Sequence, residues 1–206
     1  MKIVALEVGN LGTNCYIIYS EAQKRAAVID PGGSVERILE VLRNEDLTVD
    51  MIINTHGHAD HVLGNLALKK ATAAPILIHG DDADMLESAE RNLSAWIGGG
   101  ASCGPADKIL KEGDTITVGE IEMKVIHTGG HTPGGICLLT GNVLFSGDTL
   151  FAESIGRTDF PGGSYQQLIR NIQDKLLILD DAVRVLPGHG PETTIGWERK
   201  ANPFIQ

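Results

Sequence analysis

The chain has 206 residues, a formal net charge of −10 at pH 7 and a hydrophobic fraction of 42%. These values are typical of a folded protein and exclude an intrinsically disordered chain. We expect one domain over residues 1–206, with a substantial core. The acidic balance argues against a nucleic-acid partner, because binding phosphate groups requires a basic surface.

The three cysteines cannot all pair, and no two of them have a CxxC spacing. We therefore expect Cys15, Cys103 and Cys137 to be reduced, which favours a cytoplasmic location. Cys15 and Cys137 are expected to be small core residues of strands. Charged residues interrupt the N-terminal segment, so we expect no signal peptide. No apolar run approaches the length of a membrane span, and we expect no membrane partner.

In the first half of the chain, the hydrophobic pattern predicts strands separated by helices. Ser34 can cap a helix whose apolar residues begin at Val35 and recur with helical spacing. A second helix is expected from residue 62 to about 73, and an acidic third helix over 81–92. The expected strands cover residues 2–8, 15–19, 26–29, 49–55 and 75–79.

The second half repeats this alternation after a glycine-rich segment, Gly98–Pro105. We interpret that segment as a loop or lid, because strand patterns resume within a few residues. Ser164 and Gln167 fit a capping box that opens a helix reaching Leu176. The expected strands cover residues 115–118, 121–127, 136–139, 143–146 and 183–186. The similar order of elements in the two halves is compatible with an internal duplication.

Three histidines and an aspartate lie within six residues, directly after the apolar strand that ends near Thr55. Imidazole and carboxylate groups are the usual ligands of zinc and similar divalent metals. His56 and His58 are two residues apart in an extended segment, so their side chains point to the same side. Asp60 and His61 lie past the turn and point elsewhere. This loop therefore predicts two adjacent metal pockets.

Three further candidate ligands also lie in strand-end loops, where functional residues commonly collect. They are His131, Asp148 and His189, each next to glycine. Each of them alone is more often part of a turn or a cap than a ligand. Together they supply the ligands that the histidine loop lacks. The two remaining histidines, His79 and His127, are interpreted as structural.

Four motifs of the chain together resemble the metallo-β-lactamase superfamily, in its glyoxalase II-like branch of small hydrolases. They occur in the order of that family and cover almost the whole chain. The resemblance implies an α/β fold, a four-layer αββα sandwich in which two mixed sheets lie face to face between outer helices. The motifs are Thr55-His56-Gly57-His58-Ala59-Asp60-His61, Gly130-His131-Thr132-Pro133-Gly134, Gly147-Asp148-Thr149-Leu150-Phe151 and Pro187-Gly188-His189-Gly190.

The resemblance also implies a ligand set for two divalent metal ions, with zinc favoured and iron or manganese possible. One ion would be held by His56, His58 and His131. The other would be held by Asp60, His61 and His189, and Asp148 would bridge the two.

At several positions the sequence differs from other branches of this superfamily, and these differences restrict the expected function. Asp148 stands where the best-known β-lactamases place a cysteine, so antibiotic hydrolysis is disfavoured. His58 stands where flavo-diiron proteins typically place a glutamate, so that redox role is disfavoured too. Branches that process nucleic acids usually add a domain or a basic arm, and the sequence shows neither.

The implied reaction is cleavage of a small thioester, or of a related ester, by a metal-bound hydroxide. Asp60 would orient the hydroxide, or act as a base with one metal bound. Arg157 is a candidate for binding a substrate carboxylate, although it could instead pair with Asp159 or Glu153. Trp96 could shape another wall of the site or simply pack. The segment after His189 is too short for the glutathione-binding extension of glyoxalase II.

Two other functions remain open from the sequence. Residues 154–160 also resemble a loop of persulfide dioxygenases, in which two histidines and an aspartate hold one iron. The corresponding residues here are His56, His131 and Asp148. A metal-stabilised binding protein without activity is disfavoured, because structural zinc sites are usually rich in cysteine. Oligomeric state stays open.

Overall fold

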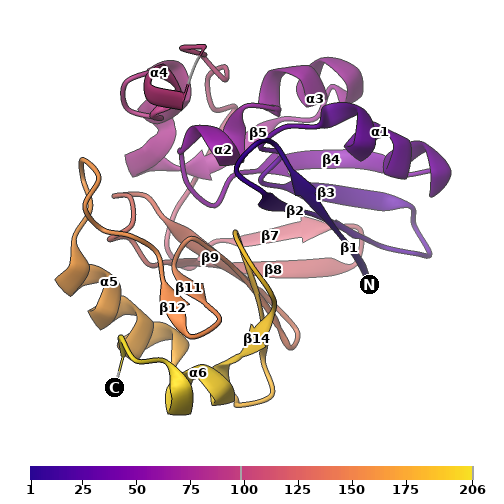
Figure 1. Ribbon diagram of the computed structural model, residues 1–206. Coiled ribbons are helices and arrows are strands. Elements are labelled where there is room, and N and C mark those ends of the chain that lie inside the picture. The colour runs from indigo at the N-terminus through magenta and orange to yellow at the C-terminus, as the bar shows by residue number, and fades with distance from the viewer. Residues whose placement is uncertain (98, 206) are drawn as a thin grey trace.

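The computed structural model describes residues 1–97 and 99–205 and contains two six-stranded sheets that lie face to face (Figure 1). The first sheet has the order β1-β2-β3-β4-β5-β6. Its first three strands are antiparallel, and the pairs from β3 to β6 are parallel. The strands are β1 (Lys2–Val8), β2 (Thr13–Tyr19), β3 (Arg25–Ile29), β4 (Thr48–Ile53), β5 (Ile76–His79) and β6 (Lys108–Leu110).

The second sheet has the order β14-β13-β10-β9-β8-β7, and only its β10–β13 pair is parallel. A short two-stranded ribbon, β11 (Leu150–Phe151) and β12 (Ser154–Ile155), follows β10 in the chain. The sheet strands are β7 (Thr115–Val118), β8 (Ile121–His127), β9 (Ile136–Thr140), β10 (Val143–Gly147), β13 (Arg184–Pro187) and β14 (Thr193–Thr194).

Helices cover the outer faces of both sheets (Figure 1). The first sheet is covered by α1 (Val35–Asn44) and α3 (Asn65–Thr72), and the second by α5 (Tyr165–Asn171) and α6 (Ile195–Ala201). The chain of α5 continues as a π-helical turn, η2 (Ile172–Leu176). The remaining short elements are α2 (Ala59–Val62), the 3₁₀ helix η1 (Gly80–Glu87) and α4 (Ser94–Ile97).

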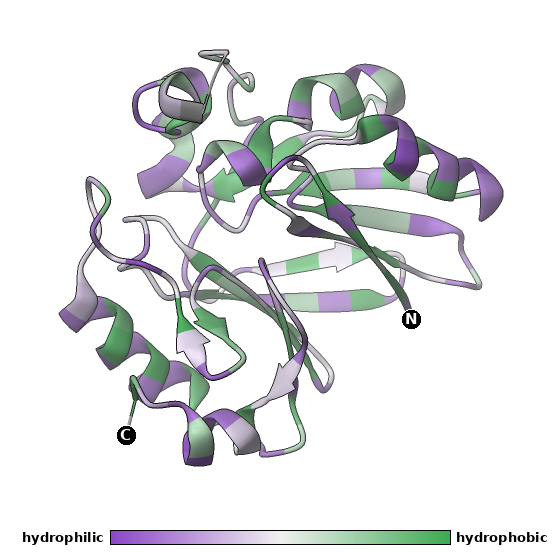
Figure 2. Ribbon diagram, in the orientation of Figure 1, coloured by the Kyte–Doolittle hydropathy of each residue, from purple (hydrophilic) through white to green (hydrophobic). Residues whose placement is uncertain are grey.

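Three apolar layers hold the four structural layers together. Along β2, Cys15 and Ile17 join the cluster under the first helices, whereas Tyr16 and Ile18 face the second sheet. This alternation follows from the two-residue period of a strand, and it leaves β2 buried on both faces. A third cluster joins the second sheet to α5, η2 and α6, and these helices carry both hydrophobic and hydrophilic residues (Figure 2). The predicted αββα sandwich is confirmed.

The structure changes three of the predicted local features. The helix predicted over 81–92 is wrong, because a short 3₁₀ helix ends at Glu87 and turns follow it. The helix predicted over 62–73 breaks near Gly64, where the backbone N–H bonds to the Pro31 carbonyl oxygen at 2.8 Å. Ser34 is not a side-chain cap of α1, since it is left-handed (φ 49°) and its hydroxyl accepts from Gly9 N–H instead.

The predicted capping box is present in half, because the Ser164 N–H bonds to the Gly130 carbonyl oxygen instead of the Gln167 side chain. The Ser164 hydroxyl accepts from the Gln167 N–H at the start of α5. Cys15, Cys103 and Cys137 are buried and free. Within the described part of the chain, no helix is both long and apolar enough to cross a membrane. Gly98, the first residue of the predicted lid, lies outside the described residues, and residues 99–105 form neither helix nor strand.

Candidate metal centre

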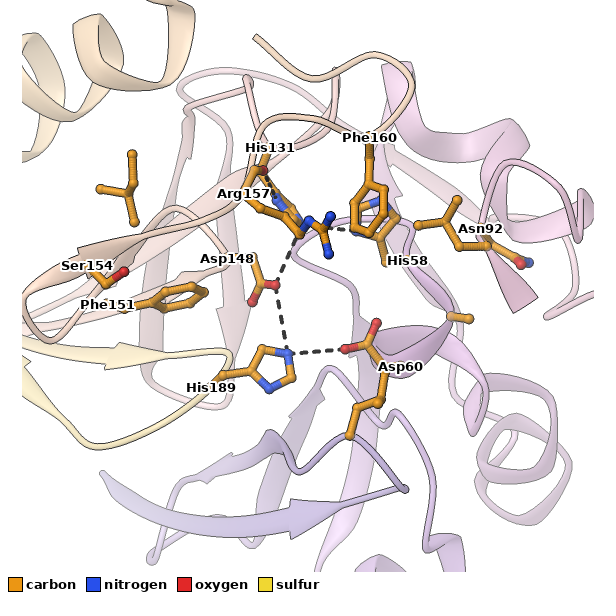
Figure 3. Close-up of a pocket in the computed structure, with 14 residues that line it drawn as sticks. His58, Asp60, Asn92, His131, Asp148, Phe151, Ser154, Arg157, Phe160 and His189 are labelled. Carbon is orange, nitrogen blue, oxygen red and sulfur yellow. Dashed lines mark hydrogen bonds and ion pairs between the residues drawn. The ribbon is translucent and has the colours of Figure 1, made fainter. Parts of the chain in front are cut away.

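The predicted ligands come from loops at the ends of four strands and meet at one edge of the two sheets. His56 and His58 follow β4, and α2 carries Asp60 and His61. Loops after β8, β10 and β13 bring the other three. Figure 3 shows side chains from both halves of the chain turned toward a common space, among them His58, Asp60, His131, Asp148 and His189.

The seven side chains form overlapping groups whose potential ligand atoms lie within 4.8 Å of one another. Two of these groups match the two predicted ligand sets. A third group contains Asp148 together with one histidine from each set. The groups are His56, His58 and His131; Asp60, His61 and His189; and His56, His61 and Asp148.

Asp148 lies between the two sets. Its Oδ2 is 3.5 Å from His131 Nε2 and 3.8 Å from His189 Nε2, and its Oδ1 is 3.4 Å from His61 Nε2. One carboxylate thus faces histidines of both sets, one oxygen toward His131 and the other toward His61. A carboxylate in this position can bridge two metal ions.

The polar atoms of the centre fit divalent ions. Among the described residues, His56 Nε2, His61 Nε2 and Asp148 Oδ1 are buried and have no hydrogen-bond partner. Unpaired buried polar groups are costly, so such atoms call for a ligand. Imidazole nitrogens and carboxylate oxygens suit zinc, iron and manganese. The residues present therefore fit the two ions that the sequence predicts.

Charges in the centre are strongly coupled. Burial lowers the pKa of His58 to about 3, and the neighbouring imidazoles act in the same direction. Burial alone would also lower the pKa of His61, but the surrounding carboxylates, Asp148 first, raise it to about 10. For Asp60, burial would raise the pKa, yet His61 and His189 hold it below the usual range. The Asp60 carboxylate is thus ionised, as a metal ligand requires.

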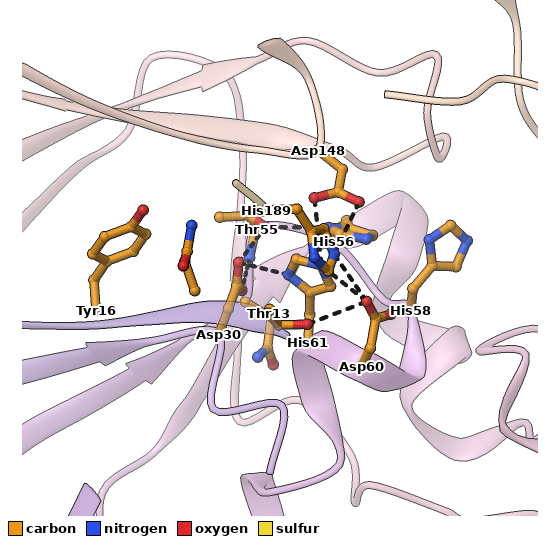
Figure 4. A network of polar contacts seen from close by, with 12 residues as sticks. Thr13, Tyr16, Asp30, Thr55, His56, His58, Asp60, His61, Asp148 and His189 are labelled. Carbon is orange, nitrogen blue, oxygen red and sulfur yellow. Dashed lines mark hydrogen bonds and ion pairs between the residues drawn. The ribbon is translucent and has the colours of Figure 1, made fainter. Parts of the chain in front are cut away.

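Asp30 supports this set and was not identified from the sequence. Its Oδ2 lies 3.0 Å from His61 Nδ1, so the other ring nitrogen is aimed at Asp60 and Asp148 (Figure 4). Thr55 donates to both of its oxygens, at 2.7 Å from the backbone and 2.6 Å from the hydroxyl. Such partners fix the orientation of a ligating histidine. A single aspartate before proline gives no sequence signal of this role.

Replacing Asp30 with asparagine should weaken metal binding by the set of Asp60, His61 and His189 by about 10- to 100-fold. Asparagine keeps the shape but loses the charge that orients His61. Metal titration of chelator-treated protein measures the change. Asp84→Asn is the matched control, because Asp84 is exposed and forms an ion pair with Arg91. Unchanged affinity in D30N would contradict the orienting role.

His131 has a partner of a different kind. Its Nδ1 lies 2.7 Å from the backbone carbonyl oxygen of Arg157, so Nδ1 carries the proton and donates it. The free Nε2 then faces Asp148 and lies 2.9 Å from His58 Nδ1. The loop after β12 therefore orients a candidate ligand through its backbone, which the sequence cannot reveal.

A cavity of about 400 Å³ opens beside the centre (Figure 3). Several candidate ligands form its floor, and its walls are largely apolar. The Phe160 ring also lies edge-on to His58, with centroids 5.4 Å apart. The apolar wall residues are Leu11, Leu93, Phe151, Ile155 and Phe160.

Arg157 lines this cavity, but its guanidinium is already paired. It donates two hydrogen bonds to Asp159, of 2.8 and 2.7 Å, and lies 3.9 Å over the Phe160 ring. Pairing with Asp159, one of the two predicted roles, is thus present, and substrate binding by Arg157 stays a prediction. Trp96 is 83% exposed and is not among the described residues that line the cavity.

His79 and His127 form a separate pair. Their rings are stacked, with centroids 4.1 Å apart and an angle of 11° between the planes. Asp81 lies near them, and the three could be taken for a third metal site. A ring nitrogen binds metal in the plane of its ring, and two nearly parallel planes do not converge on one ion. The structure is consistent with the structural interpretation of both histidines.

Comparison with known proteins decides the family. The family model described as the metallo-beta-lactamase superfamily matches residues 8–189. This chain belongs to the metallo-β-lactamase superfamily. It is a member with the αββα fold and a His/Asp cluster that suits divalent metals.

Similar proteins carry several names. The protein "Hydroxyacylglutathione hydrolase GloC" of Haemophilus influenzae is 36% identical, over 100% of this chain and 98% of that protein. The solved structure of "BLEG-1 B3 metallo-beta-lactamase" has 37% identity and a TM-score of 0.95, with 100% of both chains covered. "TTHA1623 in a di-iron-bound form" has 33% identity and a TM-score of 0.88, over 98% of this chain and 99% of the other.

Proposed function

We propose that this protein is a binuclear metal-dependent hydrolase that cleaves a small thioester or a related ester. The position of Asp148 is the observation that carries the proposal. Its carboxylate faces both predicted ligand sets, and buried unpaired atoms surround it. The similarity to the hydroxyacylglutathione hydrolase supports the thioester class.

Two bound divalent ions would supply a nucleophilic hydroxide near neutral pH and polarise the carbonyl of the substrate. Asp60 would hold the attacking water by accepting its hydrogen bond. The Thr13 hydroxyl donates to Asp60 Oδ2 at 3.2 Å and His189 Nε2 lies 3.1 Å from the same oxygen, so the carboxylate is fixed in orientation. The apolar wall beside it would hold the acyl part of the substrate and exclude bulk water.

Zinc is the proposed metal, and a cytoplasmic location is proposed because all three cysteines are free. Arg157 would bind a substrate carboxylate only by giving up its ion pair with Asp159. Such an exposed ion pair contributes little stability, so the exchange is cheap.

An iron-dependent persulfide dioxygenase is the second candidate. Two residues of that ligand set support it, since His131 Nε2 lies 3.5 Å from Asp148 Oδ2. β-Lactam hydrolysis is disfavoured by the sequence, but a similar structure is called a β-lactamase. The activity screen below therefore includes a β-lactam, and we expect no turnover of it.

Metal analysis paired with an activity screen tests the proposal. We expect about two ions per chain and turnover of S-lactoylglutathione or a simpler thioester. His58→Ala should lower both metal content and activity while leaving most of the fold intact. One iron per chain with oxygen uptake on glutathione persulfide would favour the second candidate. Metal-loaded protein that cleaves no thioester or ester would refute the proposal.

A further inference from the structure

Asp82 is a fully buried carboxylate in η1, outside the cluster of candidate ligands. It accepts three hydrogen bonds. Its Oδ2 accepts from the Gly57 N–H at 3.0 Å and from the Thr132 hydroxyl at 2.7 Å, and its Oδ1 accepts from the Gly134 N–H at 2.6 Å. Hydrogen bonds to a carboxylate are among the stronger ones in proteins, and burial protects them from water.

The three donors belong to two loops that are far apart in the sequence. Gly57 lies between His56 and His58, and Thr132 directly follows His131. Asp82 therefore joins the loop that follows β4 to the loop that follows β8. The approach is close, since a Cβ on Gly134 would lie 2.7 Å from the Asp82 nitrogen. The two loops are thus held at a fixed separation.

We propose that Asp82 is a positioning residue for the metal site of His56, His58 and His131, and that it acts on this site alone. The inference rests on the two metal sites of the proposed function. The separation of the loops decides how His58 faces His131, whose ring nitrogens lie 2.9 Å apart. Metal affinity depends on such geometry, because a ligand displaced by a fraction of an ångström loses part of its bond.

The other metal site has its own carboxylate. Asp30 contacts His61, whereas the hydrogen bonds of Asp82 to the described residues go to Gly57, Thr132 and Gly134 and not to Asp60, His61 or His189. Asp30 contacts His61 directly and also reaches His56 through the Thr55 hydroxyl, which lies 3.2 Å from His56 Nδ1. Asp82→Asn is therefore the variant expected to affect one ion alone, whereas Asp30→Asn is expected to weaken at least the ion that Asp82→Asn leaves unchanged.

The test is a titration of chelator-treated protein with zinc, followed by calorimetry. Asp82→Asn should weaken the affinity for one of the two zinc equivalents by about 10- to 100-fold and leave the affinity for the other within about twofold of wild type. Asp30→Asn should weaken at least the other equivalent. Asp84→Asn, in the same helix but exposed, should change neither. Thr132→Val, which removes one donor and keeps the shape, should give a smaller loss at the same equivalent.

Combining variants shows which site responds. Added to His58→Ala, Asp82→Asn should have little further effect, whereas added to His189→Ala it should keep its full effect. Equal weakening of both equivalents, no weakening, or additivity with His58→Ala would overturn the inference. If Asp82→Asn does not fold, Thr132→Val decides by the same criteria.

The titration does not depend on catalysis, so the positioning role of Asp82 and the proposed hydrolase activity can be refuted separately. A protein that cleaves no thioester but loses one equivalent on Asp82→Asn would refute the hydrolase and support the positioning role. A protein that cleaves thioesters and keeps both equivalents would do the reverse.

Discussion

Asp148→Ala should remove both metal ions and lower kcat/KM by at least about a thousandfold. The reason is geometric, because this one carboxylate approaches histidines of both predicted sets, at 3.4 Å on one side and 3.5 Å on the other. Alanine leaves each set one ligand short. It also removes a negative charge that lies 3.4 Å from His61, so cations are less strongly attracted.

Metal analysis after dialysis, together with turnover of the best thioester, measures this effect. Asp84→Asn is a suitable control, because Asp84 is exposed and pairs with Arg91 outside the candidate ligands. The chelator-treated forms of wild type and variant should unfold at similar temperatures. Loss of a single ion in Asp148→Ala would contradict the bridging position and leave Asp148 as a ligand of one site.

Gly32→Ala should be the most disruptive small substitution near the centre. A Cβ at this position would lie 1.5 Å from the backbone oxygen of Asp60 and 3.3 Å from the backbone nitrogen of His61. Backbone atoms cannot rotate away, so α2 or the turn after β3 must move. We expect a loss of about 3 kcal/mol or more in the free energy of unfolding. We also expect weaker metal binding by the set that contains Asp60 and His61.

Urea denaturation of the chelator-treated protein measures the free energy of unfolding, and metal titration measures the affinity for metal. Gly80→Ala is the matched control, since its Cβ would meet only the side chain of Ile109, which is partly exposed and able to shift. A Gly32→Ala protein with the wild-type midpoint and two tight ions would show that the close approach is unimportant.

The sequence predicts those parts of the molecule that depend on neighbours along the chain. A strand such as β2 was found because burial gives it the continuous apolar run Cys15–Tyr19, and the histidine loop because its ligands are crowded together. Short elements such as β11 and β14 contain two residues each and carry no period to detect. Ser34 looked like a cap, but its backbone takes a left-handed conformation that the sequence did not indicate.

The supporting groups of the site were not predictable, for a different reason. Asp30 and Asp82 act across 31 and 50 residues of sequence, on His61 and Thr132 respectively. Arg157 acts on His131 through a backbone carbonyl, which every residue has. Side-chain identity carries the information about ligands, whereas only the packing of the sheets decides which groups orient them.

The placement of the centre at the seam of the two sheets has a consequence for the lifetime of the protein. His58 and His131 are 73 residues apart and Asp60 and His189 are 129 residues apart, so each ion would be held by both halves of the chain. Neither half alone offers a complete set, and metal would therefore bind only when the sheets are docked. At a free metal concentration of 100 times Kd, one such ion stabilises the docked state by about 2.7 kcal/mol. On the proposed function, metal starvation would make the chain more susceptible to proteolysis, and its abundance would follow the metal supply.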